Sequence, residues 1–194
     1  MEQFHHPRPV WTGQRPTPER TRLLDALTGT VLELGAGDGL KLACYPAAVR
    51  EIVLVEADPF LRASAAPAAD QVAATVRILD GRPHELPVPD ASCDAVVASL
   101  VLCCSPSVQG TLREVRRVLR PGGELRFYEH QRSANPVIAC CQRLVSPVWS
   151  RAAGGCRPGR DTLAALRRAG FAVSVSASFP FHGIPHVLGT ARPR

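Results

Sequence analysis

The sequence predicts a single doubly wound α/β domain, built on a mostly parallel sheet of seven strands with helices on both faces. Three observations favour this class. The chain has 194 residues, the length of one domain with its own core. Short apolar runs alternate along it with segments of helical character, which is typical of parallel sheets. The first apolar run ends in a glycine-rich turn, the place where such folds bind ligands.

The N-terminal part is expected to alternate helix, strand and helix. A helix over 17–27 follows a proline-rich entry, with Thr17 as a candidate cap and Pro18 in its first turn. Residues 30–34 form a nearly continuous apolar run that ends at Gly35-Ala36-Gly37-Asp38-Gly39, which indicates a buried strand and a tight turn. The next expected elements are a short helical segment, a strand over 51–56 and an alanine-rich helix over 59–69.

The middle of the chain is expected to hold three strands and one amphipathic helix. The first two strands cover 75–79 and 94–100. The apolar residues Val108, Leu112, Val115 and Leu119 then recur at spacings of four, three and four, which defines one helix face. Pro121-Gly122-Gly123 is expected to stop that helix and to turn the chain into a strand over 124–129.

The C-terminal part is less regular. Residues 136–149 favour a helix with an apolar face, with Pro147 as a candidate break, and Gly154-Gly155 indicates a loop. Asp161 can cap a helix over 162–169 that Gly170 closes. Two last strands are expected over 171–177 and 186–190.

Composition and charge exclude several classes. The formal net charge is +6, and 22 of the 23 basic residues are arginines, with Lys41 as the single lysine. Because these arginines are scattered through an alanine-rich sequence, no nucleic-acid partner is predicted. The densest basic stretch, 113–120, lies on the outward side of a predicted helix. No stretch is apolar enough for a membrane span, and residues 1–18 lack a signal-peptide core. We therefore expect a cytoplasmic protein without a membrane anchor.

The seven cysteines favour buried reduced thiols over a framework of disulfides. Their number is odd, and Cys103-Cys104 and Cys140-Cys141 are adjacent pairs in place of the CxxC spacing of zinc sites. No metal site is predicted.

The glycine turn carries the most specific chemical signal. Gly35, Gly37 and Gly39 follow the pattern GxGxG, whereas dinucleotide-binding turns have GxGxxG, so a nicotinamide or flavin cofactor is disfavoured. Glycines let the backbone approach a ligand closely. Glu56 ends the second strand 21 residues after Gly35, where a carboxylate can accept both hydroxyls of a ribose.

At these residues the chain resembles the class I S-adenosylmethionine-dependent methyltransferases. The motifs that carry the resemblance lie over 31–39, 86–94 and 114–123. Further segments resemble the branch that contains alkyl thiol S-methyltransferases: Leu100-Val101-Leu102-Cys103, Tyr128-Glu129-His130, Ser146-Pro147-Val148-Trp149, Gly155-Cys156 and Pro185-His186-Val187-Leu188-Gly189. The resemblance implies a Rossmann-like methyltransferase fold, S-adenosyl-L-methionine as cofactor, S-adenosyl-L-homocysteine as product, and a small thiol as acceptor.

The resemblance also divides the single domain and assigns its site. An N-terminal arm and helix (1–29) precede a cofactor-binding core (30–130), a substrate-side lid segment (131–160) and a C-terminal helix with strands (161–194). Expected cofactor contacts are Glu33, Gly35, Ala36, Gly37, Glu56, Ala57, Asp80, Gly81, Arg82, Ser99 and Leu100. Expected acceptor contacts are Trp11, Cys103, Tyr128 and Trp149. A thiol needs only a modest push toward deprotonation, so His130 is the candidate base or thiolate partner, with Glu129 beside it.

The chain departs from the family in two places. Animal members of the thiol branch begin with a hydrophobic anchor that this chain lacks, so a bacterial-type relative is expected, as a monomer or homodimer. Many class I members carry an acidic residue after a glycine in the third-strand loop, whereas Gly81 is followed here by Arg82-Pro83-His84. Adenine contacts are therefore assigned to backbone groups or to Asp80.

Alternative functions stay open from the sequence. One is methyl transfer to oxygen, nitrogen or carbon of a natural product or quinone, and another is a non-catalytic protein that binds S-adenosylmethionine. Cysteine trios bind arsenite in a different methyltransferase branch. Here Cys140, Cys141 and Cys156 would be the only plausible set for such a trio, and that use is disfavoured.

Overall fold

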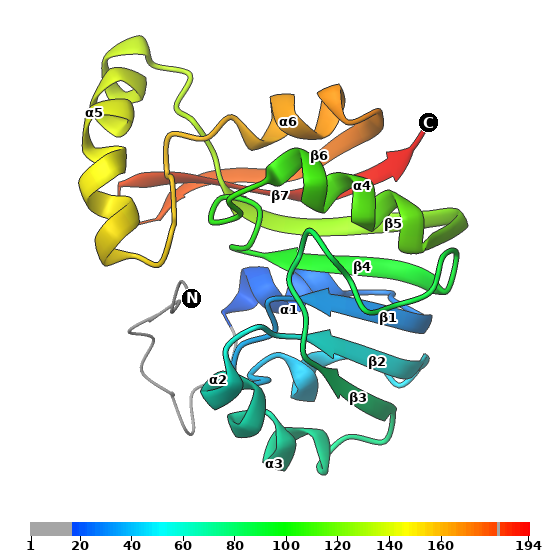
Figure 1. Cartoon of the computed structure of the whole chain (residues 1–194). Coiled ribbons are helices and arrows are strands. Elements are labelled where there is room, and N and C mark those ends of the chain that lie inside the picture. Colours follow the sequence, from blue (N-terminus) through cyan, green and yellow to red (C-terminus); the bar gives the residue numbers. More distant parts are fainter. Residues whose placement is uncertain (1–16, 182) are drawn as a thin grey trace.

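A seven-stranded sheet forms the centre of the described part of the chain. The computed structural model describes residues 17–181 and 183–194. The strands are β1 (Gly29–Leu34), β2 (Val49–Val55), β3 (Thr75–Leu79), β4 (Cys93–Ser99), β5 (Leu119–His130), β6 (Phe171–Phe181) and β7 (Ile184–Pro193). They lie in the order β3-β2-β1-β4-β5-β7-β6 (Figure 1). Only β7 runs in the direction opposite to the other six strands, which confirms the predicted mostly parallel, doubly wound sheet.

Helices cover both faces of this sheet, because each face buries its own apolar layer. The helices are α1 (Pro18–Leu24), η1 (Leu42–Cys44), α2 (Pro59–Ser64), α3 (Ala66–Ala69), α4 (Val108–Val118), α5 (Pro136–Ala152) and α6 (Thr162–Arg168). Leu112 and Leu166 of α4 and α6 pack into one layer, with Phe127 of β5. Leu24 and Leu42 of α1 and η1 pack into the other layer. The sheet thereby separates two cores.

The helix α5 stands apart from both layers, at the end of the sheet toward which β1 and β2 point (Figure 1). Ala139 is its one buried residue, whereas Val137, Leu144 and Val148 are each about 70% exposed. Within 17–181 and 183–194, no helix combines the length and apolar character that crossing a membrane requires.

Two predicted helix ends are wrong for reasons of backbone chemistry. The segment 59–69 divides into α2 and α3 at Ala65, because Pro67 in the first turn of α3 has no N–H to continue the helix. The helix α4 ends at Val118, three residues before the expected stop at Pro121-Gly122-Gly123. Leu119 already pairs with Cys93, so this proline-glycine segment forms an irregularity inside β5.

Other boundaries also differ. The helix α5 runs through Pro147, which removes one hydrogen bond at an exposed turn where water can bind the released carbonyl. The strands β6 and β7 are longer than predicted, because they pair with each other along their whole length, from Phe171–Pro193 to Phe181–Ile184. The first helix ends at Leu24, before the predicted Leu27.

Candidate functional site

The glycine turn after β1 is held against the end of β2. The amide of Gly35 donates to the Val55 carbonyl at 2.8 Å, and the amide of Gly37 donates to Glu56 Oε2 at 2.8 Å. Gly35 has a φ of +54°, and a Cβ there would lie 2.8 Å from Val101 Cγ2. Only glycine satisfies both constraints. At Gly35 and Gly37 the turn therefore exposes backbone without side chains next to the Glu56 carboxylate.

Glu56 is fixed by two amides. Besides the bond from Gly37, its Oε1 accepts from the Asp58 amide at 2.9 Å. Each carboxylate oxygen has a second lone pair, so Glu56 can still accept two hydroxyl donors from a ligand. This is the arrangement expected of a ribose acceptor.

A buried ion pair supports the turn from below. Glu33 of β1 is almost fully buried and lies 2.7 Å from Lys41 Nζ, and it accepts a 2.7 Å hydrogen bond from Tyr45 Oη. Burial, followed by the charge of Glu33, raises the pKa of Tyr45, so the tyrosine keeps its proton and donates. Glu33 thus holds the turn in place and lines neither of the two cavities described next.

Two adjoining cavities open at this turn. They share Gly35, Leu61 and Leu100, and their volumes are about 130 and 280 Å³. Together they fall in the range of roughly 300–1,000 Å³ typical of small-ligand sites. Nine predicted cofactor residues line them: Gly35, Ala36, Gly37, Glu56, Ala57, Gly81, Arg82, Ser99 and Leu100.

Two residues that line these cavities each carry a buried polar atom without a hydrogen-bond partner in the described part of the chain. Ser99 Oγ and His84 Nδ1 are both buried with no hydrogen-bond partner in the described residues, and each residue lines one cavity. An unsatisfied buried polar atom costs about 1–3 kcal/mol, so a bound polar ligand would remove that cost. With the glycine turn and Glu56, they form a polar set that fits the ribose, amino-acid and base portions of S-adenosylmethionine.

Leu100 marks the junction of the two cavities. It has a φ of +58°, a conformation that costs a non-glycine residue about 1–2 kcal/mol. Its amide donates to the Tyr128 carbonyl at 2.8 Å, which turns the chain from β4 into the following loop. Backbone strain of this kind clusters at ligand sites.

Glu129 lies under that loop and away from the cavities. It is fully buried, and its carboxylate accepts from the amides of Val101, Leu102 and Cys103 at 2.8, 2.8 and 3.0 Å. Burial raises the pKa of Glu129 against the opposing effect of these bonds. Glu129 lines neither cavity, and its backbone hydrogen bonds all come from residues 101–103, which places it beneath the loop and not beside the acceptor. It positions residues 101–103.

The other predicted catalytic residue, His130, lies at the end of β5 among sulfur and aromatic groups. Its Nδ1 is 3.1 Å from Cys156 Sγ, and its ring meets that of His186 edge-on at 4.6 Å. Tyr128, buried, stacks on His186 and Phe179 with centroids 5.3 and 6.2 Å apart. His130 and Tyr128 line neither cavity, but the Leu100–Tyr128 bond joins this aromatic cluster to the cavity wall.

Thiols approach one another beside His130. Hydrogen bonds from Cys103, Cys104 and His130 lower the pKa of Cys156. The bonds of Cys103 to its two cysteine neighbours, together with burial, raise its own pKa. The bond to Cys103 lowers the pKa of Cys104, but its bond to Cys156 and burial outweigh that effect and raise it to about 12. Cys103 itself is buried behind the cavity wall, and Cys104 lines the wall in its place.

Of three other residues predicted to contact the cofactor or the acceptor, the two within the described part of the chain line neither cavity. Asp80 is 74% exposed, pairs with Arg62 at 3.1 Å and lines neither cavity, although its neighbours Gly81 and Arg82 line one of them. Trp149 lies 38% exposed on α5 and lines neither cavity. Trp11 lies outside the described residues.

Several lining residues were missed by the sequence analysis: Asp58, Leu61, His84, Val101, Cys104 and Gly154. Asp58 had a local signal, because it caps α2 two residues after Glu56. Cys104 and Gly154 are 50 residues apart in sequence, and no local pattern indicates that they meet.

Comparisons with known proteins agree with this geometry. Residues 32–127 match the family described as "Methyltransferase domain". The chain is 33% identical over 173 residues to thiol S-methyltransferase TMT1B of Rattus norvegicus, covering 84% of this chain and 70% of that protein. It is 35% identical over 179 residues to thiol S-methyltransferase TMT1A of Homo sapiens, with the same two coverages.

Other likenesses are broader. A ubiquinone/menaquinone biosynthesis C-methyltransferase of Syntrophotalea carbinolica is 33% identical over 132 residues, covering 65% of this chain and 52% of that protein. The crystal structure of a putative methyltransferase from Bacillus halodurans superposes with a TM-score of 0.74 at 15% identity, over 91% of this chain and 98% of that one. This structural likeness establishes the Rossmann-like methyltransferase fold.

Proposed function

The chain belongs to the S-adenosylmethionine-dependent methyltransferases, and from this premise we propose that it methylates the sulfur of a small-molecule thiol. The observation that carries methyl transfer is Glu56, fixed by two amides beside the bare glycine turn and facing the paired cavities. The choice of sulfur is supported by the two thiol S-methyltransferases that resemble this chain over 84% of its length.

When bound, S-adenosylmethionine supplies a sulfonium-linked methyl group that a nucleophile attacks in line. The chain's part is to align the two reactants and exclude water. Glu56 would accept the ribose hydroxyls, Ser99 Oγ would bond the amino-acid end, and His84 Nδ1 would meet the base. Leu100 and Val101 supply apolar walls between these polar groups.

The acceptor would lie between Leu100 and the aromatic cluster of Tyr128, Phe179 and His186. These rings favour a small, uncharged, apolar molecule. A thiol with a pKa of about 8.5 is only a few per cent thiolate at pH 7, so removing its proton accelerates the reaction. His130 is the group we assign to that proton. Its Nδ1 faces Cys156, which leaves Nε2 for the acceptor.

The test of the reaction is a panel of acceptors. Purified protein is incubated with methyl-labelled S-adenosylmethionine and separate small thiols, phenols, quinones and amines, and each product is identified by mass. Label on an aliphatic thiol supports the proposal. Label only on a phenol, quinone or amine overturns sulfur as the acceptor and favours the oxygen, carbon or nitrogen alternatives. Cofactor binding without any labelled product would indicate a non-catalytic binding protein.

The role of His130 is tested by pH. His130→Ala should lower turnover with one aliphatic thiol by about 10²-fold near pH 7 while sparing cofactor binding. The deficit should shrink as the pH rises above the pKa of the thiol, because free thiolate needs no base. A rate ratio that stays constant from pH 6 to 9 would contradict a role in proton removal and leave His130 as a positioning residue.

A further inference from the structure

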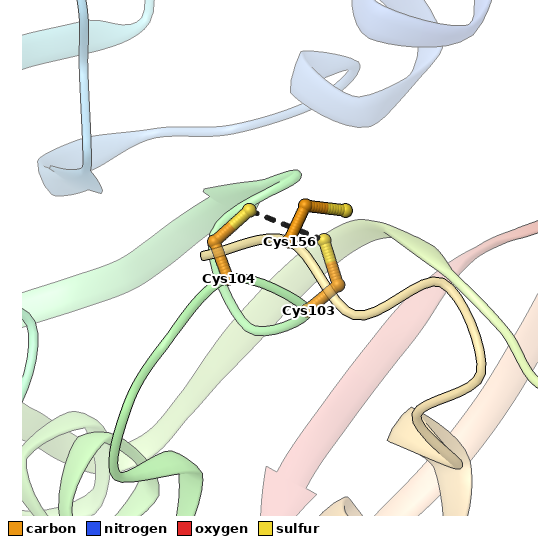
Figure 2. A group of neighbouring side chains, drawn as sticks. All are labelled: Cys103, Cys104 and Cys156. Atoms are coloured by element: carbon orange, nitrogen blue, oxygen red, sulfur yellow. Dashed lines mark hydrogen bonds between the residues drawn. The ribbon is translucent and has the colours of Figure 1, made fainter. Parts of the chain in front are cut away.

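Three cysteine sulfurs meet beside the cofactor cavity. Cys103 and Cys104 lie in the loop after β4, and Cys156 comes from the loop between α5 and α6 (Figure 2). All three Sγ atoms lie within 4.8 Å of one another, and those of Cys103 and Cys104 are 3.7 Å apart. Cys103 and Cys156 are buried, Cys104 is half-buried, and all three are free thiols. We call this group the thiol trio.

The backbone around the thiol trio is fixed from two directions. The Glu129 carboxylate holds the amide of Cys103 and the two amides before it. The amide of Arg157 donates to the Cys103 carbonyl at 3.0 Å, which ties the Cys156 loop directly to the Cys103 loop. A metal site with ligands from two separate segments needs this kind of support to hold its geometry.

A half-buried arginine supplies positive charge at the same place. Arg160 Nη1 donates to the carbonyls of Leu102 and Ser105, on either side of the Cys103-Cys104 pair. Three thiolates around a divalent cation leave one net negative charge. The guanidinium of Arg160 is therefore placed to balance it.

The spacing of the Cys103 and Cys104 sulfurs fits a small soft cation, and Cys156 lies within 4.8 Å of both. Zinc–sulfur bonds are about 2.3 Å, so two sulfurs at a tetrahedral angle around zinc lie about 3.8 Å apart. The Cys103–Cys104 separation of 3.7 Å agrees with this value. Thiolate is the ligand that selects soft metals such as zinc over magnesium or calcium.

We propose that Cys103, Cys104 and Cys156 bind one thiophilic divalent metal ion of the zinc and cadmium type, each as a thiolate that has released its proton to solvent. Three protein ligands leave the fourth position of a tetrahedral ion to water or another small ligand. The cavity that Cys104 lines supplies access to that position. His130 Nδ1, 3.1 Å from Cys156 Sγ, stabilises the coordinated sulfur by a hydrogen bond.

This proposal replaces the sequence-based expectation of no metal site. Its ligands also differ from the trio of Cys140, Cys141 and Cys156 that the sequence suggests. Cys140 and Cys141 are exposed on α5 and take no part in the thiol trio. They provide the matched control, as another adjacent cysteine pair in the same chain.

The experiment is a titration of the full chain with cadmium chloride, in a phosphine reductant that does not compete as a thiol. Thiolate-to-cadmium charge-transfer absorption is expected to saturate at one ion per chain, and zinc is expected to displace it. Cys104→Ser and Cys156→Ser should each weaken binding by more than about 100-fold, since even outer contacts of metal sites cost 10- to 100-fold. The double variant Cys140→Ser/Cys141→Ser should bind as the wild type does.

Three results would overturn the proposal: no saturating band in the wild type, binding retained in both trio variants, or binding lost in the control. Circular dichroism establishes that each variant is folded. Should the trio variants fail to fold, X-ray absorption of the cadmium-loaded wild type decides. Three sulfur neighbours support the site, and a shell without sulfur refutes it. None of these readouts requires methyl transfer, so they stand whether or not the acceptor is a thiol.

Discussion

Replacing Glu56 by alanine is expected to weaken S-adenosylmethionine binding about 10- to 150-fold. Both carboxylate oxygens are anchored, by Gly37 N at 2.8 Å and Asp58 N at 2.9 Å, so the group needs no rearrangement to receive two ribose hydroxyls. Hydrogen bonds to charged groups contribute about 1.5–3 kcal/mol. A loss of that size corresponds to the stated change in affinity, since each 1.4 kcal/mol is about tenfold.

The assay is calorimetric titration of the cofactor into the wild type, Glu56→Ala and Glu56→Gln. Glutamine keeps one acceptor oxygen and should fall between the other two. Glu51→Gln is the matched control, because Glu51 lies on β2, the strand that Glu56 directly follows, and pairs with Arg77. Unchanged affinity in a folded Glu56→Ala variant would refute the assignment of Glu56. A nicotinamide cofactor bound as tightly as S-adenosylmethionine would refute the cofactor itself.

Two further predictions concern stability. Glu129→Gln should lower the free energy of unfolding by about 1–3 kcal/mol in urea titrations, because its amide NH₂ cannot accept from a buried backbone N–H; a loss no larger than that of Glu51→Gln would contradict the support role. Burial, and then the charge of His130, lower the pKa of His186, so the unfolded chain binds a proton more readily than the folded one. The contribution of neutral His186 to the free energy of unfolding should therefore be fully present above about pH 6.5, the ordinary histidine pKa, and should be lost on acidification. In thermal melts between about pH 7 and 5, the melting temperature of His186→Phe should fall less steeply than that of the wild type.

The fold was predictable because its signals are local. The apolar run 30–34 matches β1 closely, since a strand buried on both faces needs apolar residues throughout. The segment 75–79 matches β3, which lies at the edge of the sheet with its residues exposed or half-buried. The errors arise where pairing partners decide the length of an element. The strands β6 and β7 extend beyond their apolar patterns because each supplies the other's hydrogen bonds, and no single segment contains that information.

The cofactor side of the site was also predictable, because the glycine turn and Glu56 are short motifs at the ends of consecutive strands. Glu129 could not be interpreted in the same way. An acidic residue next to His130 at a strand end suggests chemistry, but its function depends on which way the side chain points. In the structure it points into the protein, toward three loop amides of which the first, that of Val101, lies 28 residues earlier in the chain.

The thiol trio shows most clearly where sequence reasoning ends. Adjacent cysteines at 103–104 and at 140–141 are equivalent patterns, and either pair could be combined with Cys156. The difference between them is tertiary. The bond from the Arg157 amide to the Cys103 carbonyl joins two loops more than 50 residues apart, whereas α5 directs Cys140 and Cys141 toward solvent. Contacts of that kind follow from the strand order around β4 and β5, so they can be assigned only after the sheet is known.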